Sequence, residues 1–161
     1  MCMSDYGLFY RSWKSKIFNY LMRLTGDGSL AGDIMQETFT RHFGHYGEDN
    51  RDIPLLYRIA RNLFLDEMRR EKKQRGVAEE AGEEPSIDQD RRLMIRFEYR
   101  GVLSAMASLE EDEREILSLA AGGDLSYSEI ASLVGISEAN VKVKVHRARL
   151  KLKKIIKEGD R

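Results

Sequence analysis

The sequence predicts an all-α protein of two small helical domains joined by a flexible acidic linker, with a helix-turn-helix ending the second domain. Apolar residues recur every three or four positions along several stretches, and none shows the alternation of a half-buried strand. The chain has only two prolines. A polar segment at 72–90, with Gly, Pro and six acidic residues, interrupts the helical pattern. We therefore place the two domains at 1–71 and 91–161.

Two helices are expected first. The first helix, from Asp5 to about Thr25, has a broad apolar face and ends at a Gly-Asp-Gly turn. Ser29 is the expected N-cap of a second helix that runs to about Gly44. The side chains that the second helix is expected to bury are Ala31, Ile34, Met35, Phe39 and Phe43.

A polar loop at 45–53 then leads to a third helix. Asp52 and Pro54 are expected to open it, because Pro is tolerated in a first turn. Its apolar stripe comprises Leu56, Ile59, Ala60, Leu63, Phe64 and Met68.

The second domain is expected to contain about four helices. The first resumes near Arg91, and Ser108 with Glu111 predicts a capping box for the next, which ends at Gly122. The last two helices lie within 126–158.

The segment from 126 to 154 carries the pattern of a helix-turn-helix. Ser126 with Glu129 predicts a capping box, Gly135 supplies a permissive turn residue, and Ser137 can cap a longer helix. One apolar stripe on that longer helix comprises Val141, Val145, Ala148 and Leu152. The second helix of such a motif can enter a DNA major groove.

Charge favours DNA binding over an ordinary helical hairpin with a solvated, Lys-rich face. The whole chain balances 27 basic against 27 acidic residues, whereas 126–161 holds nine basic and four acidic residues. A positive excess confined to one segment indicates a local phosphate-binding surface.

The composition also excludes several classes of protein. Cys2 is the only cysteine, so neither an intramolecular disulfide nor a cysteine-based zinc site can form. No apolar run approaches a membrane span, and the N-terminus does not resemble a signal peptide, so we expect a soluble, cytoplasmic protein. We find no Gly-rich phosphate loop, no nucleophile with a matched base, and no paired Glu-x-x-His helices for a metal. We therefore predict no catalytic site, cofactor, metal or small-molecule substrate.

Three motifs occur in order along the chain: AGDIMQETFTRHF at 31–43, LYRIARNLFLDEMRR at 56–70, and SYSEIASLVGISEANVKVKVHRARLKL at 126–152. In content and spacing they resemble the sigma-70 family of bacterial transcription initiation factors, specifically the extracytoplasmic-function (ECF) group. The resemblance implies an alternative sigma factor that binds core RNA polymerase and promoter DNA, directs promoter recognition and −10 melting, and is controlled by an anti-sigma factor. Such an inhibitor can hold the sigma factor at the inner face of the membrane.

The resemblance also implies roles for individual residues. Contacts to the polymerase clamp would come from the second helix, through Asp33, Gln36 and Glu37. The −10 strand would be handled by the loop and the third helix, through Tyr46, Arg58, Arg61 and Asn62. The −35 element would be read by the last helix, through Lys142, Val143, Lys144, His146, Arg147 and Arg149. Among the last set, Val143 is expected to contact a thymine methyl group, and Lys144 and Arg149 to hold phosphates.

One alternative is a stand-alone helix-turn-helix regulator whose N-terminal domain senses a ligand or binds a partner. The final third of the chain fits both hypotheses, and the motifs at 31–43 and 56–70 favour the sigma factor. A helical enzyme, the other alternative, has no supporting site.

Overall fold

The first three helices begin and end close to the residues that the sequence predicts. The computed structural model describes residues 5–75 and 97–159, which form seven helices and no strand. α1 spans Asp5–Thr25, α2 spans Gly28–Tyr46 and α3 spans Ile53–Arg75. The first four residues of the predicted linker, 72–75, are therefore helical. The rest of that linker and the predicted helix start at Arg91 lie in 76–96, outside the described residues.

The start of α2 differs from the prediction. Asp27, and not Ser29, is its N-cap, because the Asp27 carboxylate accepts hydrogen bonds from the N–H groups of Ser29 and Leu30 at 3.0 and 3.2 Å. Aspartate is at least as good an acceptor at this position as serine. α2 also continues two residues beyond Gly44, so Tyr46 lies at its end and the loop is confined to 47–52.

The helix-turn-helix is confirmed in detail. α7 spans Tyr127–Val134 and α8 spans Glu138–Gly159. Both hydrogen bonds of the Ser126–Glu129 capping box form, and Gly135 ends α7 with a φ of 80°, a left-handed conformation that favours glycine. Ser137 accepts a hydrogen bond from the Asn140 N–H at 3.1 Å.

The second predicted capping box is wrong. α5 spans Phe97–Ala107 and α6 spans Glu111–Ala121, with Glu110 as an N-cap that makes no side-chain bond. Ser108 still belongs to the end of α5, where its hydroxyl donates to the Ser104 carbonyl oxygen and its N–H donates to the Ala105 carbonyl oxygen. It therefore cannot cap α6.

The buried faces correct one further expectation, for α2, and add one residue to the core side of α3. On α2 the imidazole of His42 is fully buried, whereas Phe43 is 49% exposed. On α3 Tyr57 is fully buried together with Leu56 and Ala60. Tyr57 is therefore a core residue, even though its neighbour Arg58 is exposed.

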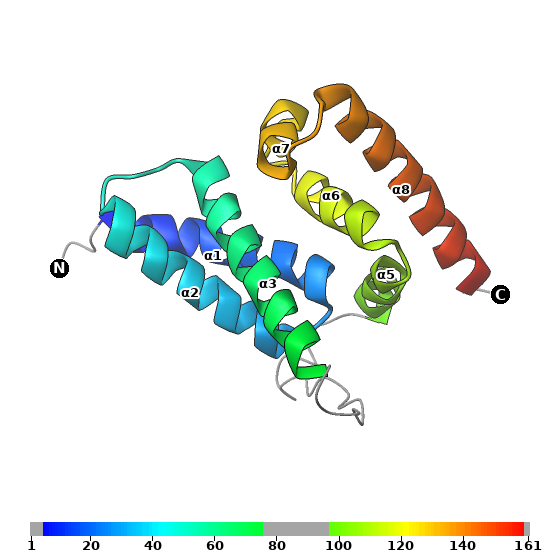
Figure 1. Cartoon of the computed structure of the whole chain (residues 1–161), viewed down its shortest axis with the longest axis horizontal. Helices are drawn as coiled ribbons and strands as arrows, with labels where there is room; N and C mark the ends of the chain where they lie inside the picture. The colour runs from blue at the N-terminus through cyan, green and yellow to red at the C-terminus, as the bar shows by residue number, and fades with distance from the viewer. Residues whose placement is uncertain (1–4, 76–96, 160–161) are drawn as a thin grey trace.

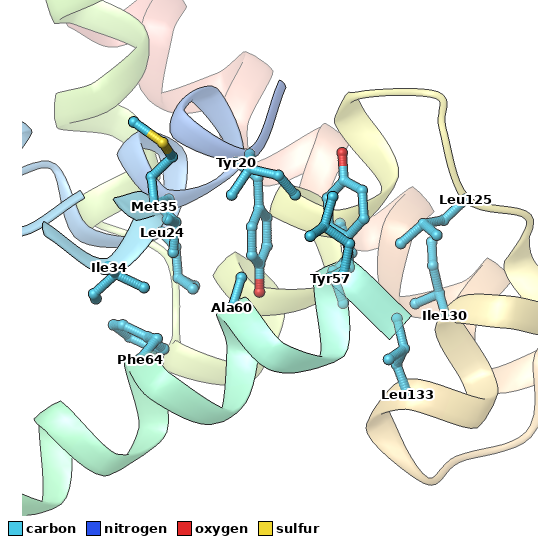
Figure 2. Packing of buried hydrophobic residues seen from close by; sticks show 14 of the residues in the cluster. Tyr20, Leu24, Ile34, Met35, Tyr57, Ala60, Phe64, Leu125, Ile130 and Leu133 are labelled. Carbon is cyan, nitrogen blue, oxygen red and sulfur yellow. The ribbon is translucent and has the colours of Figure 1, made fainter. Parts of the chain in front are cut away.

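The two helical units pack against each other. Figure 1 shows α1–α3 on one side and α5–α8 on the other, with α1 lying against α5 and α6, and the N-terminal half of α3 approaching α7. One cluster of buried side chains crosses the boundary, from Ile17 and Tyr20 of α1 to Ile116 and Leu119 of α6. In Figure 2 the ring of Tyr57 lies between the ring of Tyr20 and three apolar side chains of the second unit, Leu125, Ile130 and Leu133. We call this boundary the seam.

Candidate nucleic-acid and partner interfaces

The outer face of α2 presents the three residues expected to bind polymerase. Asp33, Gln36 and Glu37 are all exposed, because the apolar stripe of α2 faces α1 and α3. Glu37 pairs with Arg41 at 2.9 Å, and the Gln36 amide donates to the Tyr10 hydroxyl at 3.1 Å. Within the described residues, the Asp33 carboxylate has no hydrogen-bonding or ionic partner. This face is acidic and open to a basic partner.

Three of the four residues expected at the −10 strand are exposed. Tyr46 is 49% exposed at the end of α2, and Arg58 and Asn62 lie one turn apart on the exposed side of α3. An aromatic ring, a cation and an amide are the groups that stack on a base, hold a phosphate and read a base edge.

Arg61, the fourth residue, points into the seam instead. Its side chain is only 18% exposed, and its Nε forms an ion pair with the Glu115 carboxylate of α6. Its Nη1 also donates to the Leu133 carbonyl oxygen at the end of α7, at 3.2 Å. In this conformation one guanidinium therefore joins α3 to two helices of the second unit.

Other polar bonds cross the same seam, through residues that the sequence did not single out. The Tyr57 hydroxyl donates to Asp124 at 3.2 Å, and the Lys16 ammonium bonds the same carboxylate at 3.1 Å. Arg23 donates twice to the Ser118 carbonyl oxygen, at 3.3 and 3.0 Å. The partners are 67 or more residues apart in the chain, so local patterns carry no signal for them.

Several polar groups in the seam are buried at a cost. Burial raises the pKa of the Tyr20 and Tyr57 phenols and lowers the pKa of the Arg23 guanidinium. The Tyr20 and Ser118 hydroxyls are fully buried, and neither has a hydrogen-bond partner among the residues that the structure describes. Each such group loses the bonds that water would give it, which weakens the packing of the two units.

The exposed face of α8 carries most of the residues expected at the −35 element. Lys142, Val143, His146, Arg147 and Arg149 are all exposed, opposite the buried stripe of Val141, Val145 and Ala148. Val143 is 44% exposed, as a residue that contacts DNA must be in the free protein. Leu150 is also exposed, at 55%, and none of these contacts explains an apolar side chain at that position.

Lys144 is the exception on this helix. Its ammonium bonds the Asp112 carboxylate of α6 at 2.6 Å, and that bond lowers the pKa of Asp112. About two turns further along, Lys151 bonds Glu113 at 2.5 Å, which raises the pKa of Lys151. The oxygens of Glu110, Asp112 and Glu113 come within 4.8 Å of one another, a spacing that could suit a metal ion. The two lysines already offset this negative charge, so the cluster is poorly suited to a cation.

No described helix is both long and apolar enough to cross a membrane.

The sequence matches two family models in the order of the two helical units. Residues 9–74 match sigma-70 region 2, and residues 99–152 match sigma-70 region 4. The ECF sigma factor SigM of Bacillus subtilis is 31% identical over 153 residues, which cover 93% of this chain and 94% of SigM. The ECF sigma factor SigL of Mycobacterium tuberculosis is 29% identical over 157 residues, covering 92% of this chain and 87% of SigL.

The fold agrees with these matches. The sigma factor RpoE of Bartonella quintana, solved with its anti-sigma factor NepR, superposes with a TM-score of 0.73 at 22% identity, covering 96% of this chain and 98% of RpoE. The chain belongs to the sigma-70 family of transcription initiation factors, which bind core RNA polymerase and promoter DNA. Within that family it is an ECF sigma factor, and its role is promoter recognition in transcription initiation. The stand-alone regulator is not favoured, because the region 2 match, at 9–74, occupies nearly all of the N-terminal unit.

Proposed function

We propose that this ECF sigma factor divides its work among three surfaces. The acidic face of α2 would bind the clamp of core polymerase through Asp33, Gln36 and Glu37. Support comes from their exposure and from the absence of any partner for Asp33 within the described residues. A free carboxylate can pair with a basic residue without first breaking another bond.

The second surface is the exposed face of α8, which would read the −35 element in the major groove. Lys142, His146 and Arg147 can donate to base edges or phosphates, and Val143 can contact a thymine methyl group. Arg149 and Lys144 would hold phosphates. Lys144 reaches DNA only after it leaves Asp112, so its contribution is smaller than that of Arg149.

The third surface would hold the separated −10 strand, with Tyr46 stacking on a base, and Arg58 and Asn62 beside it. Arg61 completes this set only when it leaves Glu115 and the Leu133 carbonyl oxygen. We therefore propose that the packed arrangement is the resting conformation, and that the two units separate when the protein binds polymerase and DNA. The single observation that carries this proposal is the ion pair of Arg61 across the seam.

We also propose that an anti-sigma factor controls this protein in the cytoplasm. Two solved structures of similar fold are complexes: the sigma factor RpoE with the anti-sigma factor NepR, and CnrH with the cytosolic domain of CnrY. Such an inhibitor would bind the packed arrangement, in which the Arg61 guanidinium is already bonded to Glu115 and to the Leu133 carbonyl oxygen.

Run-off transcription tests the proposed function. Core RNA polymerase is assayed with and without the full chain on a promoter library, and we expect specific start sites only with the chain. Asp33→Asn should weaken polymerase binding, whereas Asp5→Asn removes a charge that is also exposed, on α1, and should not. Tight sequence-specific DNA binding by the chain alone, with no new start sites, would contradict the proposal.

A further inference from the structure

A fully buried histidine lies beneath the loop proposed to receive the −10 strand. His42 of α2 has no exposed surface, and its ring stacks against Phe9 and Tyr6 with centroids 5.4 and 5.8 Å away. The ring of Tyr46 is 6.1 Å away. A buried histidine can be simply a polar member of the core. The hydrogen-bond partners of its two ring nitrogen atoms show whether this one also acts on the loop.

One ring nitrogen is directed at the loop. Nε2 of His42 lies 3.3 Å from the Asn50 side-chain oxygen, and Nδ1 lies 3.1 Å from the Tyr6 hydroxyl. The Asn50 oxygen also accepts the Asp52 N–H at 2.9 Å, which fixes the orientation of the amide. Nε2 therefore donates to Asn50, which leaves Nδ1 of the neutral ring as an acceptor. The single proton of the Tyr6 hydroxyl is shared between Nδ1 and the Phe39 carbonyl oxygen, which lies 3.0 Å from that hydroxyl.

These bonds connect the core to the start of α3. The Asn50 oxygen joins His42 to the Asp52 backbone, and the Asp52 carboxylate accepts the Leu55 N–H at 3.2 Å in the first turn of α3. The loop 47–52 is thus tied to the aromatic cluster at one end and to the helix that carries Arg58 and Asn62 at the other.

A second contact holds the loop from its outer side. The Arg51 guanidinium lies 4.9 Å above the Phe9 ring and donates to the carbonyl oxygens of Glu48 and Asn50. Phe9 therefore contacts both His42 and Arg51. The loop is fixed from both sides around one ring.

Burial supports a neutral His42. It lowers the pKa of the imidazole, the hydrogen bond to Asn50 and the charge of Asp52 act in the opposite direction, and Arg51 adds to the lowering. Tyr6, on the other side, has a raised pKa and stays uncharged. The neutral ring keeps Nδ1 free to accept from Tyr6.

We infer that His42 is a positioning residue, which acts through Asn50 to hold the loop 47–52 and Tyr46 ready for the −10 strand. The inference rests on the proposed role of this loop. A loop ordered before binding avoids the entropy cost of ordering during promoter opening, and a base pocket tolerates little displacement. Loss of the bond to Asn50 should therefore lower the rate of promoter opening more than it lowers the stability of the fold.

Two variants of His42 separate positioning from packing. In His42→Gln the longer side chain can still bring an amide N–H near the Nε2 position, whereas in His42→Asn the amide reaches only the Nδ1 position. Both remove the ring. With holoenzyme on a duplex promoter, we expect the rate of open-complex formation to fall about tenfold for His42→Asn and by less than about threefold for His42→Gln. Their melting temperatures should fall by similar amounts.

Asn50→Ala keeps the test decisive if the His42 variants fold poorly. It removes the acceptor outside the core, and should slow opening about as much as His42→Asn, while −35 binding in the assembled holoenzyme is unchanged. Equal loss of opening in His42→Gln and His42→Asn, or normal opening in Asn50→Ala, would overturn the inference. Failure of wild-type holoenzyme to open any promoter would instead contradict the proposed function.

Discussion

The ion pair between Arg61 and Glu115 predicts that a small change on α6 increases binding at the −10 surface. Both side chains are less than a fifth exposed, at 18% and 15%, so solvent screens their attraction little. Glu115→Gln keeps the shape and one acceptor but removes the charge. A hydrogen bond between charged groups contributes about 1.5–3 kcal/mol, and roughly half of it should remain with the neutral amide.

The loss of about 0.75–1.5 kcal/mol shifts the equilibrium between packed and separated units about three- to twelvefold towards separation. The apparent affinity for a ligand of the minor state rises by the same factor while that state stays minor. We therefore expect Glu115→Gln to bind a single-stranded −10 oligonucleotide about three- to twelvefold more tightly than wild type. Fluorescence anisotropy with the full chain, without polymerase, measures this affinity.

Glu111→Gln is the matched control, because Glu111 lies on the same helix, is exposed, and loses the same charge. It corrects for the general gain in DNA binding that any lost negative charge produces. Equal gains in the two variants, or no gain in Glu115→Gln, would refute the argument that the seam occupies Arg61.

Three further predictions concern single residues. Val143→Ser should lower the preference for thymine at one −35 position about fourfold, the contribution of one buried methyl group, in a binding assay with all four base pairs; an unchanged preference would contradict the contact. Arg149→Gln should reduce the slope of log affinity against log salt by about 0.9, and Lys144→Gln by less, because Asp112 already offsets the Lys144 charge. Burial lowers the pKa of His42 below its usual 6.5, so the unfolded chain binds more protons and stability should fall as the pH drops below about 6.5. His42→Gln should flatten that part of a plot of melting temperature against pH, and an unaltered slope would assign it to other groups.

Local signals in the sequence were sufficient for most of the helices. The Ser126–Glu129 box and Gly135 lie within ten residues of one another, and their bonds depend on little else, so α7 and its turn were predicted correctly. Ser108 failed as a cap because it first completes the last turn of α5, and a residue held in one helix cannot adopt the extended backbone of the next cap.

The choice between His42 and Phe43 shows where hydrophobicity alone misleads. Buried positions on α2 follow the helical period through Ala31, Ile34, Met35 and Thr38 to His42, so the period itself indicated the histidine. Phe43 was preferred because it is the more apolar residue. A polar ring is stable in the core here because both nitrogen atoms have partners.

The seam could not be predicted from the sequence. Arg61 was expected at the −10 strand, but its partners in the structure, Glu115 and Leu133, are 54 and 72 residues away in the chain. Helical periodicity and capping motifs relate residues only a few positions apart, so they carry no information about these pairs. The exposure of Asp33 and Val143, by contrast, follows from the helical period of their own helices.

The chain carries its own optical probe of this seam. Trp13 is the only tryptophan, and the Lys16 ammonium that lies 4.4 Å above its indole ring is also the group that bonds Asp124 across the seam. When the units separate, Lys16 loses its carboxylate partner, and the charge next to the indole is free to move. Intrinsic fluorescence can therefore follow the separation in unlabelled protein, with the kinetics of polymerase or inhibitor binding recorded from one native side chain.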